Sequence, residues 1–256
     1  MSAPAMDRIQ SERQFHDEQA LRRADTFRRD RHRLQFSDDQ YLDHESWLRP
    51  AWAELGPLDG KSVLDYGCGH GMAAVALARH GARMTAFDLS ADYIAEARER
   101  ARANDVAIDF LQADGHALPF PDSSFDAVWG NAVLHHLDLA VAGRELRRVL
   151  KPGGVAVFCE PWGENPLLRW ARRRLPYPGK ERTRDEEPLR RRDLDGLHES
   201  FPKIQVRGFQ MLSMVRRAVR IAPLMAGLER LDRLLLSVAP SLENWCRYVV
   251  LTLRRD

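Results

Sequence analysis

The sequence lacks the features that mark several common protein classes. Its three cysteines, Cys68, Cys159 and Cys246, have no paired spacing, so neither a disulfide framework nor a zinc site is indicated. The net charge of +2 falls short of the basic excess typical of dedicated nucleic-acid binders, and we expect no nucleic-acid partner. No apolar run reaches the roughly 18 residues of a membrane-spanning helix. The start has no apolar core of a secretory signal. We therefore expect a cytoplasmic protein.

What the sequence does contain is a regular alternation of strand and helix patterns. The apolar content of 44 % over 256 residues is enough for one large α/β domain with extensions. Strands are expected at 62–67, 82–90, 106–114, 125–133 and 154–162, and helices at 71–81, 91–105 and 140–151. We expect the last of these helices to end at Pro152 and Gly153. Strands that alternate with helices predict a doubly wound, mainly parallel sheet.

Glycines cluster where the first strand is expected to end. The stretch 63–71 reads VLDYGCGHG and places three glycines within five residues. A strand, a glycine turn and a helix N-terminus together present backbone N–H groups to a ligand at the carboxyl edge of the sheet. A dinucleotide site would have the spacing G-x-G-x-x-G, but Met72 stands where its third glycine would be. Another ligand is therefore indicated.

This stretch resembles motif I of the class I S-adenosylmethionine-dependent methyltransferases. Four further stretches are similar to that family: TAFDLS at 85–90, QADGHALPFPDSSFDAV at 112–128, VLHHL at 133–137 and RVLKPGG at 148–154. Together they cover residues 61–160. The resemblance implies S-adenosylmethionine as the cofactor and a Rossmann-like methyltransferase fold with a seven-stranded sheet. It also implies a methyltransferase of the kind that modifies small molecules.

The sequence patterns on either side of the matched region divide the chain into three parts. Residues 1–56 are expected to form an N-terminal helical cap or lid, and 57–162 the cofactor-binding core. Residues 163–256 are expected to hold substrate-side insertions and the last two strands of the same sheet. The amphipathic stretch 209–239 could cap an apolar substrate pocket or touch a membrane surface. Because the chain must return to the sheet afterwards, we favour the cap.

Residues at the expected strand ends are the candidates for binding the cofactor. A carboxylate accepts hydrogen bonds from both hydroxyls of a ribose, which suits Asp88, although Asp88 could instead cap the next helix. Asp114 matches the acid that meets the adenine amino group, or lies in a surface turn. Asp65 is expected to face the methionine ammonium, and Gly71 to let the following helix pack against the sheet. The full candidate set is Asp65, Gly67, Cys68, Gly69, Gly71, Asp88, Leu89, Asp114, Gly115 and Asn131.

Several residues compete for the role of general base. His135 and His136 leave the fourth strand, but adjacent side chains do not face the same way, so we expect only one to reach the substrate. Glu160 ends the fifth strand, and His16 lies in the expected lid. The acidic cluster at 184–189 is a further candidate. No third ligand lies near the two histidines in sequence, so no metal site is expected.

The acceptor is the least specified feature. NAVL, from Asn131, lacks the prolines and aromatic residue of enzymes that methylate base amines. We expect a small-molecule acceptor, methylated on oxygen, such as a natural product, sugar or lipid-like metabolite. Two alternatives stay open: an RNA or protein substrate bound through the arginine-rich stretch 169–192, or a regulatory protein that binds the cofactor without turnover.

Overall fold

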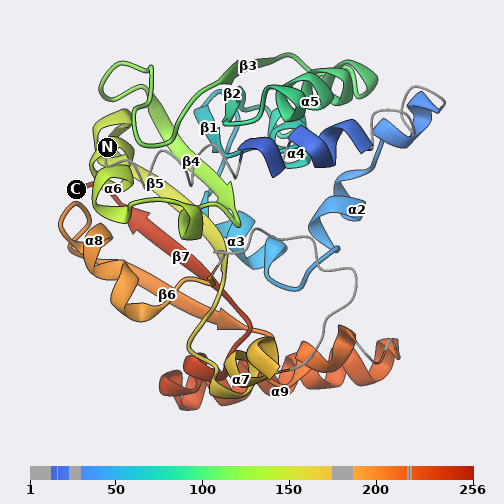
Figure 1. Cartoon of the computed structure of the whole chain (residues 1–256), viewed down its shortest axis with the longest axis vertical. Coiled ribbons are helices and arrows are strands. Elements are labelled where there is room, and N and C mark those ends of the chain that lie inside the picture. The colour runs from blue at the N-terminus through green and yellow to red at the C-terminus, as the bar shows by residue number, and fades with distance from the viewer. Residues whose placement is uncertain (1–12, 16, 23–29, 175–186, 218, 220) are drawn as a thin grey trace.

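A seven-stranded sheet forms the centre of the protein, as the computed structural model shows for residues 13–15, 17–22, 30–174, 187–217, 219 and 221–256 (Figure 1). Its strand order is β3-β2-β1-β4-β5-β7-β6. Only β7 runs antiparallel to its neighbours, β5 and β6. The strands are β1 (Ser62–Tyr66), β2 (Arg83–Asp88), β3 (Ile108–Gln112), β4 (Phe125–Asn131), β5 (Leu150–Pro161), β6 (Ile204–Phe209) and β7 (Tyr248–Arg254). The doubly wound, mainly parallel sheet predicted from the sequence is confirmed.

Helices connect the strands and extend the chain on both sides of the core. The α-helices are α2 (Asp38–Leu42), α3 (Leu48–Glu54), α4 (Met72–Arg79), α5 (Ala91–Ala103), α6 (Leu139–Val149), α7 (Pro166–Arg174), α8 (Asp195–His198) and α9 (Ala222–Val238). Single 3-10 turns are η1 (Arg31–Leu34), η2 (Leu134–His136), η3 (Arg191–Leu194), η4 (Ser213–Arg217) and η5 (Pro240–Trp245). Residues 13–15 and 17–22 are also helical. In the part of the chain that the structure describes, no helix combines the length and apolarity needed to cross a bilayer.

The sheet separates two apolar cores. Successive side chains of a strand point to opposite faces. Val63 and Trp129 accordingly enter the core shared with α2, α3, α4 and α5, whereas Leu64 and Val128 enter the core shared with α6 and α8. The strands are thus covered on both faces, which explains why they read as continuous apolar runs in the sequence.

The chain changes direction across the sheet at β1. From β1 it runs through β2 to β3 at one edge, and it then returns to β4 on the other side of β1. The helices that follow β1 and β4 therefore lie on opposite faces of the sheet. This arrangement opens a crevice beyond the carboxyl ends of β1 and β4, where ligands of doubly wound sheets bind.

The helix before the fifth strand is shorter than the sequence suggested. We expected it to end at Pro152 and Gly153, but α6 ends at Val149, and Leu150 already pairs with Phe125 in the sheet. Proline restricts the residue before it to extended backbone, so the helical pattern cannot continue through Lys151. The carbonyls of Arg148 and Val149 also accept the N–H groups of Ser123 and Ser124, which precede β4, at 2.9 and 2.8 Å, so they are not used to continue the helix.

Candidate active site

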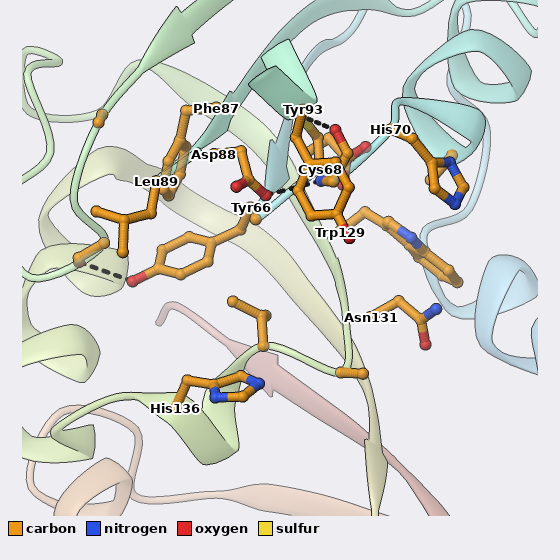
Figure 2. A pocket seen from close by; sticks show the side chains of 18 of the residues that line it. Tyr66, Cys68, His70, Phe87, Asp88, Leu89, Tyr93, Trp129, Asn131 and His136 are labelled. Carbon is orange, nitrogen blue, oxygen red and sulfur yellow. Dashed lines mark hydrogen bonds between the residues drawn. The ribbon is translucent and has the colours of Figure 1, made fainter. Parts of the chain in front are cut away.

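A cavity of about 290 Å³ lies at the carboxyl ends of β1, β2 and β4 (Figure 2). Nine of the ten cofactor residues predicted from the sequence line it; Gly71 is the exception. Among the predicted bases His136 lines the cavity, and Figure 2 shows it across the opening from Asp88 and Tyr93. Residues 67–71 form the turn from β1 into α4, so the glycine stretch borders the cavity as expected.

Asp65 carries an unusual carboxyl group. Its side chain is 2 % exposed, and its Oδ2 atom has no hydrogen-bond partner among the described residues. Burial raises the pKa of Asp65 to about 8; the Ala74 backbone N–H opposes the rise, and the nearby Asp88 adds to it. A cationic group of a ligand at this oxygen would favour the ionised carboxylate and lower its pKa. The cavity therefore holds a buried acid suited to bind a positive charge.

Two further polar groups in the cavity were not singled out from the sequence. The Tyr41 hydroxyl and the Trp129 indole N–H are buried and lack partners at hydrogen-bonding geometry among the described residues. Burial and the proximity of Asp65 raise the pKa of Tyr41, while Trp129 opposes the rise, so the hydroxyl stays protonated and can donate. Tyr41 belongs to α2 and Trp129 to β4.

The three glycines of the turn have left-handed backbone angles, with φ of +68° at Gly67, +49° at Gly69 and +82° at Gly71. A Cβ on Gly67 would lie 2.6 Å from the Val133 side chain, whereas one on Gly69 would meet no atom within 4 Å. At Gly71 it would lie 2.7 Å from the Ala97 Cβ. We expected Gly71 to serve packing of the helix on the sheet, but its close approach is to α5. Gly69 lines the cavity, and its missing side chain leaves space there next to the backbone.

Asp88 joins the glycine turn to the start of α5. One carboxylate oxygen accepts the Gly69 N–H at 2.8 Å, and the other accepts the Ser90 N–H at 2.9 Å. The N-cap of α5 is Ser90, whose hydroxyl accepts from the Tyr93 N–H, so Asp88 is not itself the cap. Asp88 is 8 % exposed and borders the cavity. The two hydrogen bonds hold its carboxylate in a fixed orientation at the cavity edge.

Asp114 is oriented by a histidine that the sequence reasoning missed. The Asp138 N–H donates to His116 Nε2 at 2.9 Å, so the neutral ring carries its proton on Nδ1 and donates it to Asp114 at 2.7 Å. Gly115 next to it serves packing: the Tyr66 hydroxyl donates to its carbonyl at 2.7 Å, and a Cβ would lie 2.4 Å from that hydroxyl oxygen. The loop carrying Asp114 is thus fixed to β1.

Two of the predicted bases do not reach the cavity. Glu160 is fully buried, and its Oε1 accepts the N–H groups of Val133 and Leu134 at 2.9 and 2.8 Å. Its Oε2 lies 2.7 Å from Nδ1 of His135, whose side chain is also buried. These two residues do not fit the role of base; they fix the segment that carries His136.

The remaining sequence candidates are outside this cavity or outside the described residues. His16 and residues 184–186 lie outside the described residues. Glu187, from the same acidic cluster, pairs with Arg190 at 2.7 Å. No residue of α9 is among those that line this cavity in the described structure. The described N-terminal helix does come close, because Gln19 accepts from the hydroxyl of Tyr93 at 2.6 Å.

The fold and the site define a class of protein. Residues 64–158, from β1 to β5, match the family model of a methyltransferase domain. The chain therefore carries a class I S-adenosylmethionine-dependent methyltransferase domain, and S-adenosylmethionine is the cofactor of this class.

Similar proteins extend this result. Over 167 residues the chain is 36 % identical to 2-methyl-6-phytyl-1,4-hydroquinone methyltransferase of Synechocystis sp.. The aligned stretch covers 60 % of this chain and 47 % of that protein. Over 138 residues it is 39 % identical to fatty-acid O-methyltransferase of Mycolicibacterium smegmatis, with coverages of 52 % and 49 %. The chain thus spans about half the length of these curated relatives.

A solved structure has the same fold over a longer stretch. The S-adenosylmethionine-dependent methyltransferase from Mesorhizobium loti superposes with a TM-score of 0.56 at 23 % identity. The match covers 84 % of this chain and 100 % of the other. It therefore extends beyond residues 64–158, the part of the chain that the family model matches.

Proposed function

We propose that this protein transfers a methyl group from S-adenosylmethionine to an oxygen of a small molecule, such as a natural product, sugar or lipid-like metabolite. The observation that carries the proposal is the buried, unpartnered Oδ2 of Asp65 in a glycine-lined cavity. The names of the two curated relatives, which specify a hydroquinone and a fatty acid, favour the lipid-like end of this range.

The cavity residues fit the parts of the cofactor. Asp65 would hold the methionine ammonium, and the Tyr41 hydroxyl would donate to the methionine carboxylate. Asp88 would accept from the ribose hydroxyls and Asp114 from the adenine amino group. Gly69 leaves room for the ligand to approach the backbone, because no atom stands where its Cβ would be. A dinucleotide would offer no ammonium group to donate hydrogen bonds to Asp65, so this acid favours a ligand with an amino-acid moiety.

When bound, S-adenosylmethionine supplies a methyl group already activated by a sulfonium. The chain's task is then to align the acceptor and exclude water, and positioning of this kind contributes on the order of 7–11 kcal/mol. For a hydroxyl acceptor, His136 is the cavity residue placed to accept the proton. Asn131 lines the same cavity and would help to orient the acceptor.

Calorimetric titration tests the cofactor part of this proposal. The protein should bind both S-adenosylmethionine and S-adenosylhomocysteine, and Asp88→Ala should weaken both by about 10- to 100-fold, since it removes a charged hydrogen-bond acceptor worth about 1.5–3 kcal/mol. Because Asp88 also holds the Gly69 N–H, circular dichroism must first show that the variant is folded. Absence of binding by the wild-type protein, or equal affinity in the variant, would refute the site.

His136→Ala should separate catalysis from cofactor binding. We expect kcat to fall about 10²- to 10⁴-fold, the usual contribution of a general base, with the affinity for S-adenosylhomocysteine unchanged. The assay follows labelled methyl transfer from S-adenosylmethionine to a panel of quinols, phenols, sugars and fatty acids. His44→Ala, at an exposed histidine, is the matched control and should keep full activity. Full activity of His136→Ala would exclude this residue as the base, and transfer to none of the panel would contradict the acceptor class.

A further inference from the structure

Exposed apolar side chains are concentrated in one part of the molecule. Among the described residues, ten of the eleven large apolar side chains that are exposed lie between positions 167 and 245, and only Leu21 lies elsewhere. The ten are Leu167, Trp170, Leu212, Val215, Ile221, Leu224, Leu231, Leu234, Val238 and Trp245. Single exposed apolar residues are normal on a protein surface, but a concentration of this kind marks an interaction site.

Helix α9 turns its apolar side outward. Its only buried residue is Asp232, whose carboxylate accepts the Leu212 N–H at 2.8 Å and both the N–H and the hydroxyl of Ser213 at 3.0 and 2.7 Å. Leu231, Leu234 and Val238 follow each other at helical spacing and are 41, 60 and 78 % exposed. A helix on the surface of a globular protein normally has the opposite orientation, with its apolar stripe toward the core.

Helix α7 also exposes large apolar side chains, and it lies near α9. Leu167 and Trp170, one turn apart, are 65 and 58 % exposed. Asn165 caps α7 by accepting the Leu167 N–H, and its amide donates to the carbonyl of Trp245 at 2.6 Å. Trp245 ends η5, which follows α9 directly and packs against it. Figure 1 shows α7 and α9 together beyond β6. We call the side chains of Leu167, Trp170, Leu224, Leu231, Leu234 and Val238 the α7–α9 face.

The charges around this face have one sign. The sequence of α7, PLLRWARRR, has four arginines and no acid. On α9 the two acids are engaged by the protein, since Asp232 is buried and Glu229 pairs with Arg216. Arg230 and Arg233 of the same helix are exposed. The α7–α9 face thus presents leucine, valine and tryptophan beside arginines.

We propose that the α7–α9 face docks on the surface of an anionic lipid bilayer. An amphipathic helix with basic residues beside a stripe of large apolar residues lies in the bilayer interface, with its apolar side among the first acyl carbons. Exposed tryptophan is enriched at that depth, and arginines are attracted to anionic headgroups. A second copy of this chain fits less well, because a two-fold contact through this face would bring the same arginines of both copies together. This proposal is independent of the reaction proposed above.

Vesicle co-sedimentation of the full chain tests the docking. The protein should sediment with vesicles that mix phosphatidylcholine and phosphatidylglycerol, and less with pure phosphatidylcholine, and added salt should weaken binding because it screens the arginines. The double variant Leu234→Gln/Val238→Gln should lower the partition coefficient at least about tenfold, since each side chain loses apolar burial. Arg230→Gln/Arg233→Gln should lower it about fivefold per residue on the anionic vesicles only.

Matched controls keep the result specific. Leu21→Gln changes an equally exposed leucine outside the face and should leave binding unchanged. The Leu234→Gln/Val238→Gln variant should also retain its affinity for S-adenosylhomocysteine, because no residue of α9 lines the cavity. A loss of vesicle binding can therefore be distinguished from a failure of the proposed methyl transfer. The proposal is overturned if the wild type ignores anionic vesicles, if both double variants bind them as it does, or if sedimentation velocity shows that the face instead holds a dimer.

Discussion

Replacing Asp65 with asparagine is expected to stabilise the cofactor-free protein and at the same time to weaken cofactor binding about 30- to 300-fold. The stabilisation follows from the pKa of about 8 that burial gives this carboxyl group in the folded state, against an ordinary value near 4 in the unfolded chain. Between these two pH values the folded protein retains a proton that the unfolded chain has released. The contribution of Asp65 to stability is therefore complete below about pH 4 and declines as the pH rises to about 8.

Asparagine cannot ionise, so the variant does not share this decline. The difference in unfolding free energy between variant and wild type should grow from pH 5 to pH 8, by at most about 1.4 kcal/mol per pH unit, and level off above that. Urea unfolding without ligand, repeated at several pH values, measures it. Asp126→Asn is the control with the opposite sign, because Lys151 lowers the pKa of Asp126, and its loss should destabilise the protein at neutral pH.

The loss of affinity has a separate signature. If the methionine ammonium lies against Asp65, binding at pH 7 ionises this carboxyl group and releases up to one proton, which titrations in buffers of different ionisation enthalpy detect. Asp65→Asn should abolish this proton release. Tyr41→Phe removes another unpartnered polar group from the cavity without removing a charge, so it should weaken binding but retain the release. Equal affinity and equal proton release in Asp65→Asn would exclude Asp65 as the ammonium site.

The second large effect is expected at Glu160. Glu160→Ala should lower the free energy of unfolding by about 3–5 kcal/mol, because the buried N–H groups of Val133 and Leu134 and the ring of His135 lose their shared partner. The segment carrying His136 would then lose its support. Methyl transfer should therefore fall along with stability, as measured by denaturant unfolding and the labelled-methyl assay.

Glu160→Gln distinguishes support from catalysis. Glutamine keeps one oxygen for the two backbone N–H groups and an amide that can donate to His135, so most of the stability and activity should return. A general base would behave differently, since glutamine cannot accept a proton and would be as inactive as alanine. A stable but inactive Glu160→Gln would therefore contradict the supporting role.

Much of the cavity was predictable because its parts are local in sequence. Each acid follows a strand pattern directly, and a parallel sheet brings the carboxyl ends of neighbouring strands to one edge. The glycines of residues 67–71 need no tertiary information either, because their spacing alone separates this turn from a dinucleotide site. Strand pattern and turn chemistry thus placed Asp65, Asp88 and Asp114 at one cavity.

Other parts of the cavity depended on contacts between distant segments. Tyr41 reaches it from α2, which packs on the same face of the sheet as α4 and α5 but lies far before them in the sequence. Nothing in the period of α2 distinguishes a core tyrosine from a cavity tyrosine. Glu160 ends a strand just as Asp88 does. Its side chain nevertheless turns into the protein, where the loop after β4 supplies the hydrogen-bond donors that hold it.

The sequence by itself determined the fold class, the succession of the core strands along the chain and the strand ends that border the cavity, because these follow from local hydrophobic period and turn chemistry. The tertiary structure decided which polar groups face the cavity and which support it, since that depends on partners many residues away. It also decided the orientation of α9. The helical period of 222–238 shows that one side is apolar, but only the buried contacts of Asp232 turn that side away from the protein.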